Sequence, residues 1–428
     1  MTDVAATKPR SRFAVPAWCL FDWANSPFPT VVVTFIFGTY FQKAIIGDEV
    51  QATHLWGLAI SVSALAVAVF GPILGATVDA GMRRKPWLLA ATVLTIVAGG
   101  GLWFATPDES SIWLVLLLVA LSNFGFELGM VFYNAMLPEL APRSHIGRIS
   151  GWAWGLGYAG GLACLVLALF ALVRAEPPPF GLDTAMAEEI RAVAPLVVLW
   201  LVLFGWPLFV FTPETHGDHL KFGQALRKGI AALGATFRNI RGYANIARFL
   251  IARMFYIDGL NTLFAFGGVY AAGSFGMDFE EVLIFAIALN VTAGIGAFLF
   301  AWVDDWIGAK PTLVISLVAL IASGAAILLV EDKLWFWVLG LVIGIFMGPT
   351  QSSSRSMMAR LAPPHMMTEM FGLFALSGKA TAFLGPLLVG MLTLAADSQR
   401  VGMSVILGFF ILGLLLLFTV REPREESA

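Results

Sequence analysis

The sequence predicts an all-α membrane protein of twelve transmembrane helices, arranged as two six-helix bundles. Of its 428 residues, 59% are hydrophobic and only 13% are charged, and the mean hydropathy is +0.83. Soluble domains carry about 25% charged residues, so this chain has too few polar side chains to cover its apolar surface in water. The apolar residues also gather in long runs, and a helix of about 20 apolar residues crosses the hydrocarbon of a bilayer.

Twelve such runs follow one another along the chain, each bounded by Pro, Gly or charged residues. Only helices and closed barrels satisfy their backbone hydrogen bonds inside hydrocarbon, and runs of this length predict helices. We place the spans at 16–42, 54–78, 87–106, 112–137, 149–173, 192–212, 246–273, 280–303, 311–330, 334–358, 368–394 and 402–420.

Positive charge follows a pattern around these spans. Most of the 26 Lys and Arg residues lie near the two ends of the chain and in the connections after even-numbered spans. Cytoplasmic loops retain Lys and Arg, so both termini are expected in the cytoplasm. Lys8, Arg10 and Arg12 begin this pattern. The apolar run behind them exceeds the core of a signal peptide, which is about 7 to 15 residues, so no cleavage is expected.

The longest connection, residues 213–245, divides the chain into an N-terminal bundle at 1–212 and a C-terminal bundle at 246–428. Its apolar residues recur at helical spacing opposite a basic side, which predicts an amphipathic helix on the cytoplasmic surface. A flexible linker with incidental apolar residues is the alternative. The apolar positions are Phe222, Leu226, Leu233, Phe237 and Ile240, and the basic positions are Arg227, Lys228, Arg238 and Arg241.

The two halves share short matching segments. A Leu-Ala-Pro string followed by a glycine recurs at one constant spacing, within 140–151 and 361–372. Transporters built from two parallel repeats bind substrate near mid-membrane at the interface between the repeats, so these matches predict a central site. The first span of each half also carries an acid and an amide three residues apart, as Asp22 with Asn25 and Asp258 with Asn261. At the spacing of the Leu-Ala-Pro string, Asn134 corresponds to Arg355 and Tyr158 corresponds to Lys379.

Several of these segments resemble the vacuole-effluxer family of the major facilitator superfamily, whose best-known fungal members export amino acids from the vacuole. The resemblance spans most of the chain, and the string in the first span is fairly specific to this family. It implies the major facilitator fold and secondary transport. The strings are Phe21-Asp22-Trp23-Ala24-Asn25-Ser26, Phe132-Tyr133-Asn134-Ala135-Met136-Leu137-Pro138-Glu139, Gly155-Leu156-Gly157-Tyr158-Ala159-Gly160-Gly161, Arg253-x-x-Tyr256-x-Asp258-Gly259 and Gln351-Ser352-Ser353-Ser354-Arg355-Ser356.

Six ionisable residues fall inside the predicted spans, where a charge costs about 2.5 to 3.5 kcal/mol and is kept mainly for a partner, water or function. Glu127 lies on a polar strip of its span and is the candidate protonatable coupling residue. The alternative is that Glu127 is permanently paired and holds helices together. The six residues are the acids Asp22, Glu127 and Asp258 and the bases Arg253, Arg355 and Lys379.

The embedded charges of both signs suit a zwitterion such as an amino acid. Guanidinium and ammonium groups hold a carboxylate, while acids from the other half hold an ammonium. The alternatives are that Arg253 or Arg355 pairs internally with Asp258 or Glu127, and that Asp22 caps its helix or contacts headgroups. The full candidate set for substrate binding or coupling is Asp22, Asn25, Glu127, Tyr133, Asn134, Tyr158, Arg253, Tyr256, Asp258, Asn261, Gln351, Arg355 and Lys379.

Charged residues at the cytoplasmic ends of the spans form a second group, which we assign to gating through salt bridges that open and close with the halves. Ala80 stands where the superfamily's loop pattern has a basic residue, and Gly81 comes one position early. The details of a locking role for this loop therefore stay open. The gating candidates are Asp79, Arg83, Arg84 and Asp305, with Asp304 beside them.

The remaining notable residues are assigned to packing or to the lining of the path. Glycine pairs let helices approach closely because no side chain intervenes. The histidines lack the spacing of zinc ligands, so no metal site is expected. The glycine pairs are Gly71 with Gly75, Gly157 with Gly161 and Gly294 with Gly296. The candidates for lining the path are Trp23, Trp152 and Trp154. Cys19 and Cys164 are assigned to packing, and His216 and His219 are the closest histidine pair.

Together these features predict a secondary active transporter for a small polar or zwitterionic solute, coupled to protons, with an amino acid as the leading candidate by resemblance. No ATP-binding motif or catalytic constellation is identified, so neither a cofactor nor an enzyme is expected. The alternatives are a lipid or amphipathic-molecule transporter with an apolar groove, and a non-transporting receptor or scaffold with a packed centre. The expected partners are the solute, protons and membrane lipids, and a monomer suffices. The net charge of -2 argues against nucleic acid, and the compact loops favour a bacterial plasma membrane.

Overall fold

The computed structural model describes residues 11–214 and 220–422, and every regular element within these ranges is a helix. Eleven of the described helices are long and apolar enough to cross a bilayer. The chain is therefore an all-α, multi-pass integral membrane protein, as predicted. Lys8, Arg10, His216 and His219, on which expectations were placed above, lie outside the described residues.

The first group of helices begins with a continuous helical segment from Ala14 to Ile46. It starts as α1 (Ala14–Asn25) and continues through wider turns after Pro27 and Pro29, which supply no amide donors to a regular helix. The other long helices of the group are α3 (Glu49–Asp79), α4 (Arg84–Gly101), α5 (Ile112–Ala135), α7 (Ile146–Ala168) and α9 (Val193–Phe211), with short pieces α2 (Phe37–Tyr40), α6 (Leu137–Leu140) and α8 (Glu188–Arg191) between them.

The second group of helices begins after the central connection. Aspartates start two of its helices: Asp278 accepts a hydrogen bond from the amide of Glu281, and Asp332 accepts one from the amide of Leu334. Each such cap satisfies an amide that has no partner within the helix. The helices are α11 (Ala244–Phe275), α12 (Phe279–Ile307), α13 (Ala309–Leu329), α14 (Lys333–Leu361), α15 (Met367–Ser377), α16 (Leu384–Ala396) and α17 (Gln399–Phe418).

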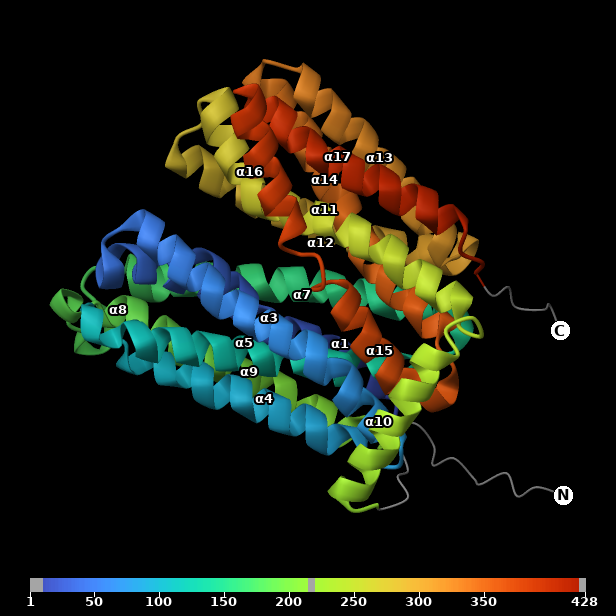
Figure 1. Cartoon of the computed structure of the whole chain (residues 1–428). Coiled ribbons are helices and arrows are strands. Elements are labelled where there is room, and N and C mark those ends of the chain that lie inside the picture. Colours follow the sequence, from blue (N-terminus) through green and yellow to red (C-terminus); the bar gives the residue numbers. More distant parts are fainter. Residues whose placement is uncertain (1–10, 215–219, 423–428) are drawn as a thin grey trace, which may run out of the picture.

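The predicted span 368–394 is wrong as a single continuous helix. It is divided into α15 and α16 by irregular turns at 378–383. Gly378 follows the last residue of α15, and Pro386 lies in the first turn of α16, where the missing amide costs no helical hydrogen bond. α15 packs against α3 and α5 of the first group, whereas α16 packs against α17 (Figure 1).

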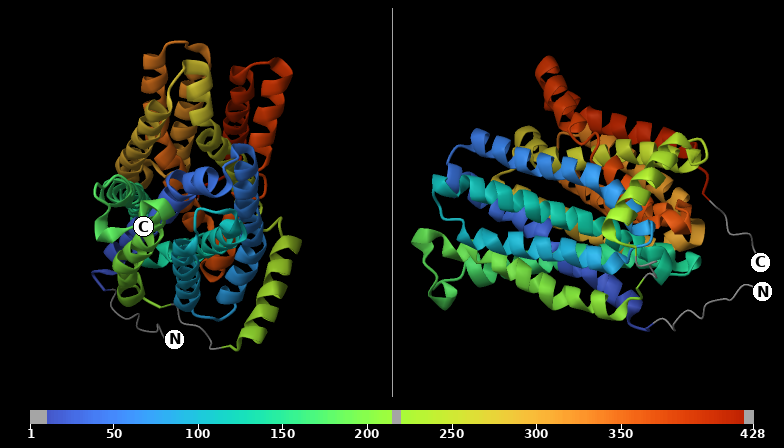
Figure 2. Two further views of the ribbon diagram at one scale, coloured as in Figure 1. Left: turned by 90° about the vertical axis from the view of Figure 1, so that its left-hand side faces the viewer. Right: turned by 60° about the horizontal axis from the view of Figure 1, so that its bottom comes forward.

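The two groups of helices touch at the end where both described chain ends lie and diverge toward the other end (Figures 1 and 2). α7 of the first group packs against α12 and α14, and α15 of the second group packs against α3. One helix of each group thus contacts the other group closely. Glycines make both contacts close: a side chain at Gly75 would collide with the backbone of Thr368, and one at Gly151 would collide with Ala301. Two such reciprocal contacts are expected of a chain built from two related halves.

Close packing agrees with most members of the predicted glycine pairs, but a side chain at Gly71 would meet its nearest neighbour at an ordinary contact distance of 3.7 Å. Gly157 and Gly161 lie against Ser26 and Thr30 in the first helical segment, and Gly296 lies against the backbone of α14. At each of these three glycines an added side chain would collide with atoms of the neighbouring helix.

The central connection contains a helix, α10 (Phe222–Arg238), which packs against α3. The side that meets the protein carries Ala225, Gly229 and Thr236, all buried. The larger apolar residues of the predicted amphipathic face, such as Phe222 and Phe237, remain about half exposed. The helix therefore docks mainly through small residues, while Phe222 also packs against Trp87 at 5.7 Å and Leu233 packs against the apolar core.

Candidate functional site

Arg355 occupies the centre of the molecule, where α14 carries it against the first group of helices. Its side chain is 2% exposed, and its Nη1 donates to Asp22 Oδ2 at 3.0 Å and to Asn134 Oδ1 at 3.3 Å. Its Nε and Nη2 donate to the Oγ and the backbone O of Ser150, at 2.9 and 2.7 Å. A guanidinium with this many acceptors is held in one orientation, so Arg355 ties the two groups together.

Aromatic rings enclose the same guanidinium. Its carbon lies 4.9 Å from the ring centroid of Trp18, 4.8 Å from that of Trp154 and 5.7 Å from that of Tyr133. Trp18 and Tyr133 stack at 4.4 Å, and each donates a side-chain hydrogen bond to the backbone carbonyl of the other. Cation–π attraction strengthens where water is excluded, so this box adds to the stability of the buried charge.

The ion pair of Arg355 answers one of the open alternatives. Pairing of Arg355 with Asp258 or Glu127 is wrong, because its acidic partner is Asp22 in the other half. Its contact with Asn134 joins two residues that the repeat register had placed in corresponding positions. Asp22 is likewise no helix cap here, because it lies within α1, and it is no headgroup contact, because its side chain is only 3% exposed.

A cavity of about 820 Å³ lies next to this ion pair, on the side toward the diverging end, between the two groups of helices. Its walls are mostly apolar, and several of its polar groups lie beside the ion pair. Gln351 Nε2 donates to the hydroxyl of Tyr158 at 2.9 Å, which joins α14 to α7 across the cavity floor. Asn25 Nδ2 lies 3.2 Å from the sulfur of Met130. The polar lining residues are Asp22, Asn25, Ser26, Thr30, Thr34, Trp154, Tyr158, Tyr270, Asn290 and Gln351.

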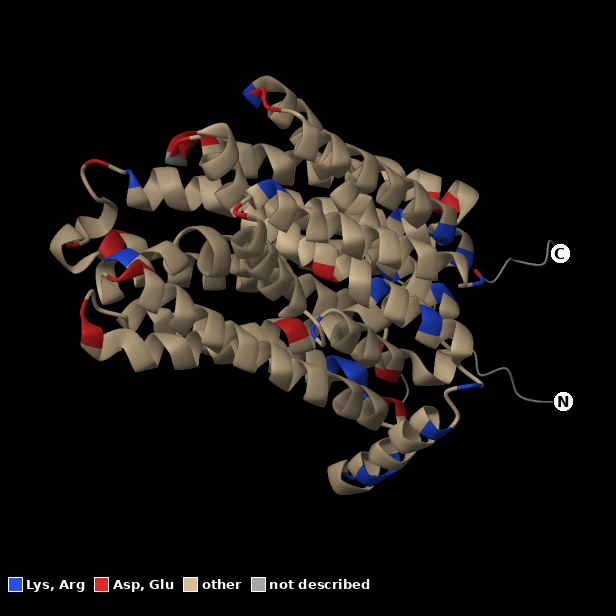
Figure 3. Cartoon of the chain, turned by 45° about the horizontal axis from the view of Figure 1, so that its top comes forward, with Lys and Arg blue, Asp and Glu red and all other residues tan. Residues whose placement is uncertain are grey.

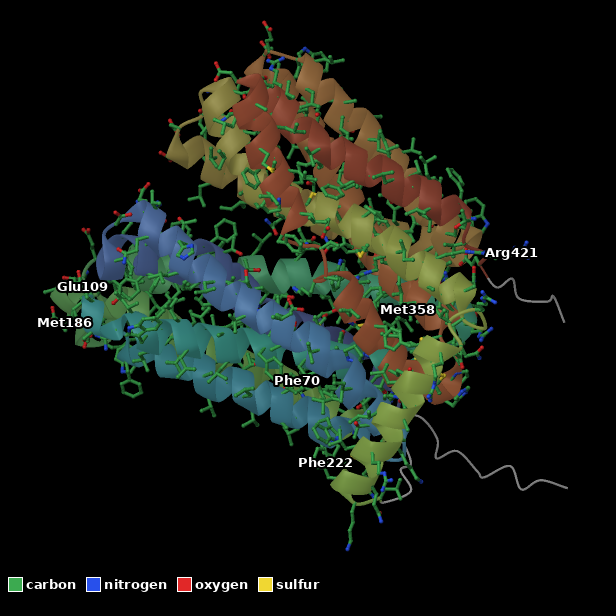
Figure 4. All side chains as sticks on the ribbon, viewed as in Figure 1. Phe70, Glu109, Met186, Phe222, Met358 and Arg421 are labelled. Atoms are coloured by element: carbon green, nitrogen blue, oxygen red, sulfur yellow. The ribbon has the colours of Figure 1, made fainter. Side chains whose placement is uncertain are left out.

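The cavity extends toward the end where the two groups diverge. Its lining includes Phe35, Tyr270 and Phe336, which lie on the parts of their helices farthest from the contact end. Figure 4 places Glu109 and Met186 at this diverging end and Arg421 at the opposite one. A solute that enters from the diverging end would meet the polar floor and stop above Arg355.

Glu127 and Lys379 form a second ion pair between the two groups. Lys379 Nζ lies 2.6 Å from Glu127 Oε1, and the side chains are 25% and 23% exposed, respectively. Lys379 is part of the irregular turns between α15 and α16, whereas Glu127 lies within α5. Neither residue lines the 820 Å³ cavity. Glu127 is thus paired in this conformation, and its role in coupling stays a prediction.

Arg253 supports the broken helix and pairs with no acid in the described chain. Its Nη1 donates to the backbone O of Phe374 at 2.7 Å and to the hydroxyl of Ser377 at 2.8 Å, and its guanidinium lies 3.5 Å from the Phe374 ring centroid. Arginine near a helix C-terminus satisfies carbonyls that have no partner within the helix. The predicted pairing of Arg253 with Asp258 or Glu127 is therefore not observed.

The other candidates on α11 lie in three different environments. Tyr256 is buried, and its hydroxyl lies 2.7 Å from that of Ser354 on α14. Asp258 is 1% exposed, and neither of its carboxylate oxygens has a hydrogen-bond partner among the described residues. Asn261 is exposed and does not line the cavity. The acid–amide match between the halves is thus a match of sequence and not of environment.

The gating candidate Asp79 closes the contact between α3 and α15. Its Oδ2 accepts from the amide of Glu369 at 2.8 Å, in the first turn of α15, where unpaired amides favour an anion. Arg84 lies 4.0 Å from Asp79 and donates to Glu139 at 2.8 Å and to the hydroxyl of Thr368 at 3.1 Å. These contacts hold the second half against the first at the contact end.

Asp305 occupies the corresponding position in the second half. It lies 3.4 Å from Arg148 of α7 and 3.5 Å from Arg360 of α14, and its neighbour Asp304 lies 2.7 Å from Arg360. Each half of the chain therefore carries an acid in an equivalent position that contacts the other half at the contact end. Arg83, the fourth gating candidate, is exposed.

Sequence reasoning missed three residues of this site: Ser150, Arg360 and Asn290. Ser150 immediately precedes the glycine of the repeated string, and Arg360 occupies the register position of Glu139, so the repeat could have pointed to both. Asn290 has no comparable signal, because an amide within an apolar run is also common as a packing residue.

The three tryptophans predicted to line the path have separate places. Trp154 lines the 820 Å³ cavity, whereas Trp23 stacks on Trp200 at 5.5 Å within the first group. Trp152 lines a second cavity of about 910 Å³ on the flank of the molecule, between α1, α7, α9 and α12. This second cavity is almost wholly apolar and shares Tyr158 and Asn290 with the first.

The site offers little to a metal ion or a prosthetic group. Within residues 11–214 and 220–422, no group of three or more His, Cys, Asp or Glu residues is placed to hold a metal. Cys19 and Cys164 are free and buried in different clusters of apolar side chains. The chemistry available to the cavity is therefore that of hydrogen bonds, ion pairs and apolar contact.

Comparison with known proteins adds the family. The family described as vacuole effluxer Atg22 like matches residues 10–146 and 143–428. An uncharacterized MFS-type transporter of Bacillus subtilis, YxiO, is 27% identical over 416 residues, which cover 96% of this chain and 95% of the relative. Autophagy-related protein 22 of Yarrowia lipolytica is 21% identical over 345 residues, which cover 72% of this chain and 57% of the relative.

Solved structures agree on the fold. FucP, the fucose:proton symporter of Escherichia coli, has been solved in the outward conformation, and that structure matches with a TM-score of 0.74 at 14% identity, over 96% of this chain and 99% of FucP. At this identity the similarity concerns the fold alone. Together with the match along nearly the whole sequence, it places the protein: the chain is a membrane transporter of the major facilitator superfamily and belongs to the vacuole effluxer Atg22-like family.

Proposed function

We propose that this transporter moves a small zwitterionic solute, with an amino acid as the leading candidate, by alternating access driven by a proton gradient. The moving bodies are the six-helix bundles at 1–212 and 246–428, joined by the connection at 213–245. α15 and α16 together form the eleventh of twelve spans, and both termini are cytoplasmic. Each bundle rocks as a unit about the central site, as in other transporters with internal repeats.

The observation that carries this proposal is the polar floor of the 820 Å³ cavity, set directly above a buried ion pair between the bundles. Asp22 belongs to both, because it lines the cavity and binds Arg355. An ammonium group of the solute would compete with Arg355 for Asp22, while the neutral donors of Asn25, Tyr158 and Gln351 face its carboxylate. Binding would thus loosen the bond that holds the bundles together, which links the solute to the conformational change.

The distribution of charge supports the proposed orientation. Figure 3 shows Lys and Arg gathered at the end of the molecule where both described chain ends lie, and mainly acids in the loops of the opposite end. Positive loops favour the cytoplasm, so the cavity would open to the outside. The Bacillus subtilis relative favours a bacterial plasma membrane.

Uptake by purified protein in proteoliposomes tests the proposal. A mixture of radiolabelled L-amino acids is offered with and without an imposed pH gradient, and the gradient should increase accumulation in protein-containing vesicles only. Asp22→Asn should abolish this uptake, because the amide cannot attract the ammonium group. Asn261→Ala serves as the matched control, since Asn261 is exposed and lies outside the cavity. Failure of tight vesicles to take up any amino acid would contradict the proposal.

One observation favours a second candidate, a transporter for lipids or other amphipathic molecules. The 910 Å³ flank cavity is almost wholly apolar and shares the lining residues Tyr158 and Asn290 with the central cavity. A headgroup in the polar cavity with a chain in the flank cavity would use both spaces. Translocation of a fluorescent phospholipid in the same vesicles separates the candidates, because the amino-acid proposal expects no lipid movement above that of protein-free vesicles.

A further inference from the structure

Asp258 is a buried acid without a partner. Its side chain is 1% exposed, and both carboxylate oxygens lack a hydrogen bond in the described part of the chain. The group that faces it is the hydroxyl of Thr381, which belongs to the turns between α15 and α16 and is also unpartnered in the described residues. Buried polar atoms are nearly always satisfied, so a buried carboxyl group without a partner calls for an explanation.

The nearby bases are engaged elsewhere. Arg253, on the same helix, donates to the backbone of Phe374 and to Ser377, and Arg355 on α14 is bound to Asp22. Lys379, two residues before Thr381, is bound to Glu127. The hydroxyl of Tyr256 is paired with Ser354. None of these groups is paired with Asp258 in this conformation, within the described residues.

An isolated carboxylate in such a site would cost several kcal/mol, and the usual outcome is that the group stays neutral by holding a proton. In the protonated form the carboxyl group can donate to the Thr381 hydroxyl that faces it. We propose that Asp258, positioned by Thr381, carries the transported proton. This inference rests on the proposed function and gives Asp258 the role that the sequence suggested for Glu127.

The neighbouring ion pair supplies a reason for the proton to leave. Glu127 and Lys379 belong to opposite bundles, so the pair parts when the bundles rock. The freed ammonium of Lys379 lies on the same irregular turns as Thr381 and becomes available to Asp258. The O–H bond of Asp258 then breaks, the proton passes to water on the cytoplasmic side, and the carboxylate pairs with Lys379. When the bundles rock back, Lys379 returns to Glu127 and Asp258 takes a proton from the outer cavity.

Infrared spectroscopy of the purified protein tests the site without any solute. A protonated buried carboxyl group has a carbonyl band distinct from that of a carboxylate, and the difference spectrum between two variants isolates one group. At neutral pH the wild type should show a band that Asp258→Asn lacks. Glu127→Gln should also lose the band, because it frees Lys379, and the double variant E127Q/K379M should regain it. The double variant keeps the test decisive if Asp258→Asn fails to fold.

The opposite pattern would overturn the proposal: a band that survives in Asp258→Asn, or one that stays absent in E127Q/K379M, would assign the proton to Glu127 or to another acid. Thr381→Val should shift the band and Thr381→Ser should restore its position, which a merely structural role of Thr381 would not produce. The band is independent of transport, so a failure of amino-acid uptake would contradict the proposed function and leave this result to stand by itself.

Transport by the same variants in proteoliposomes, compared with the wild type, gives a second readout. Asp258→Asn should lose accumulation driven by a pH gradient while it retains exchange of labelled for unlabelled amino acids, since exchange needs no proton release. Accumulation at the wild-type level in Asp258→Asn would also overturn the proposal.

Discussion

Three ion pairs join the bundles in the described residues, and two of them differ in nearly every physical respect. Arg355 and Asp22 are 2% and 3% exposed and lie within aromatic rings and further hydrogen bonds. Lys379 and Glu127 are about a quarter exposed and have a single contact of 2.6 Å. A buried pair is costly to break one partner at a time, whereas a pair in contact with water is cheap to break and re-form. The first pair is suited to holding a state and the second to switching.

The backbone around each pair agrees with this contrast. Arg355 lies within α14, a continuous helix, and its position is fixed by close packing of that helix against α7 and α12. Lys379 lies on the turns at 378–383, where two helices end and regular hydrogen bonding is interrupted. Irregular backbone at membrane depth is tolerated where it lines protein or a cavity, and transporters use such breaks as moving parts.

Removal of Arg355 should have the largest effect on stability. Arg355→Met leaves Asp22 buried without a partner and should lower the free energy of unfolding by about 3 to 5 kcal/mol. Thermal unfolding of the purified protein in detergent measures this change. The double variant R355M/D22L removes both charges and should recover most of the loss. Equal unfolding temperatures for the single and double variants would show that the pair is not what stabilises the contact.

Removal of Lys379 should change transport far more than stability. Lys379→Met breaks a partly exposed pair, so the free energy of unfolding should fall by about 1 kcal/mol or less. Uptake should be lost, because the switch between Glu127 and Asp258 has no cation. The charge swap E127K/K379E restores the pair but not the supply of a cation to Asp258, so it should recover stability without transport. Recovery of full transport would favour a purely structural pair.

The smallest effect concerns the contact of α10 with α15. Thr236 Oγ1 donates to Glu369 Oε1 at 2.6 Å, which bridges the connection and the second bundle at the contact end. Thr236→Val removes this bond and should weaken the contact by about 1 kcal/mol, so that it opens more often. Faster labelling of a cysteine introduced at Ser150 would report the opening. Thr236→Ser keeps the bond and should label at the wild-type rate.

Much of the fold could be predicted from the sequence because the bilayer imposes simple rules. Long apolar runs must be helices, and eleven of the twelve predicted spans correspond to helices that could cross the membrane, whereas the predicted span at 368–394 is divided. The break at 378–383 could not be predicted in this way, since an apolar run does not reveal whether its hydrogen bonds are regular. Gly378 and Pro386 were visible, but both residues also occur within continuous membrane helices.

The site was predicted as a set of residue types and not as a set of pairs. The rule that embedded charges face protein correctly singled out Arg355 and Asp22, which meet at 3.0 Å. Their pairing depends on how the bundles pack across the repeat, which no single sequence encodes locally. The same limit explains Asn261, whose spacing from Asp258 matches the first half although its side chain faces away from the cavity.

The central claim is that the cavity closes at one end as the contact opens at the other. Electron paramagnetic resonance distances in proteoliposomes test this most directly, with spin labels in separate pairs at Glu109 and Glu331 for the diverging end and at Ser144 and His365 for the contact end; all four residues are exposed. On addition of the transported amino acid and a pH gradient, the account predicts that the first distance shortens while the second lengthens. Distances that stay constant, or that change in the same direction, would contradict alternating access.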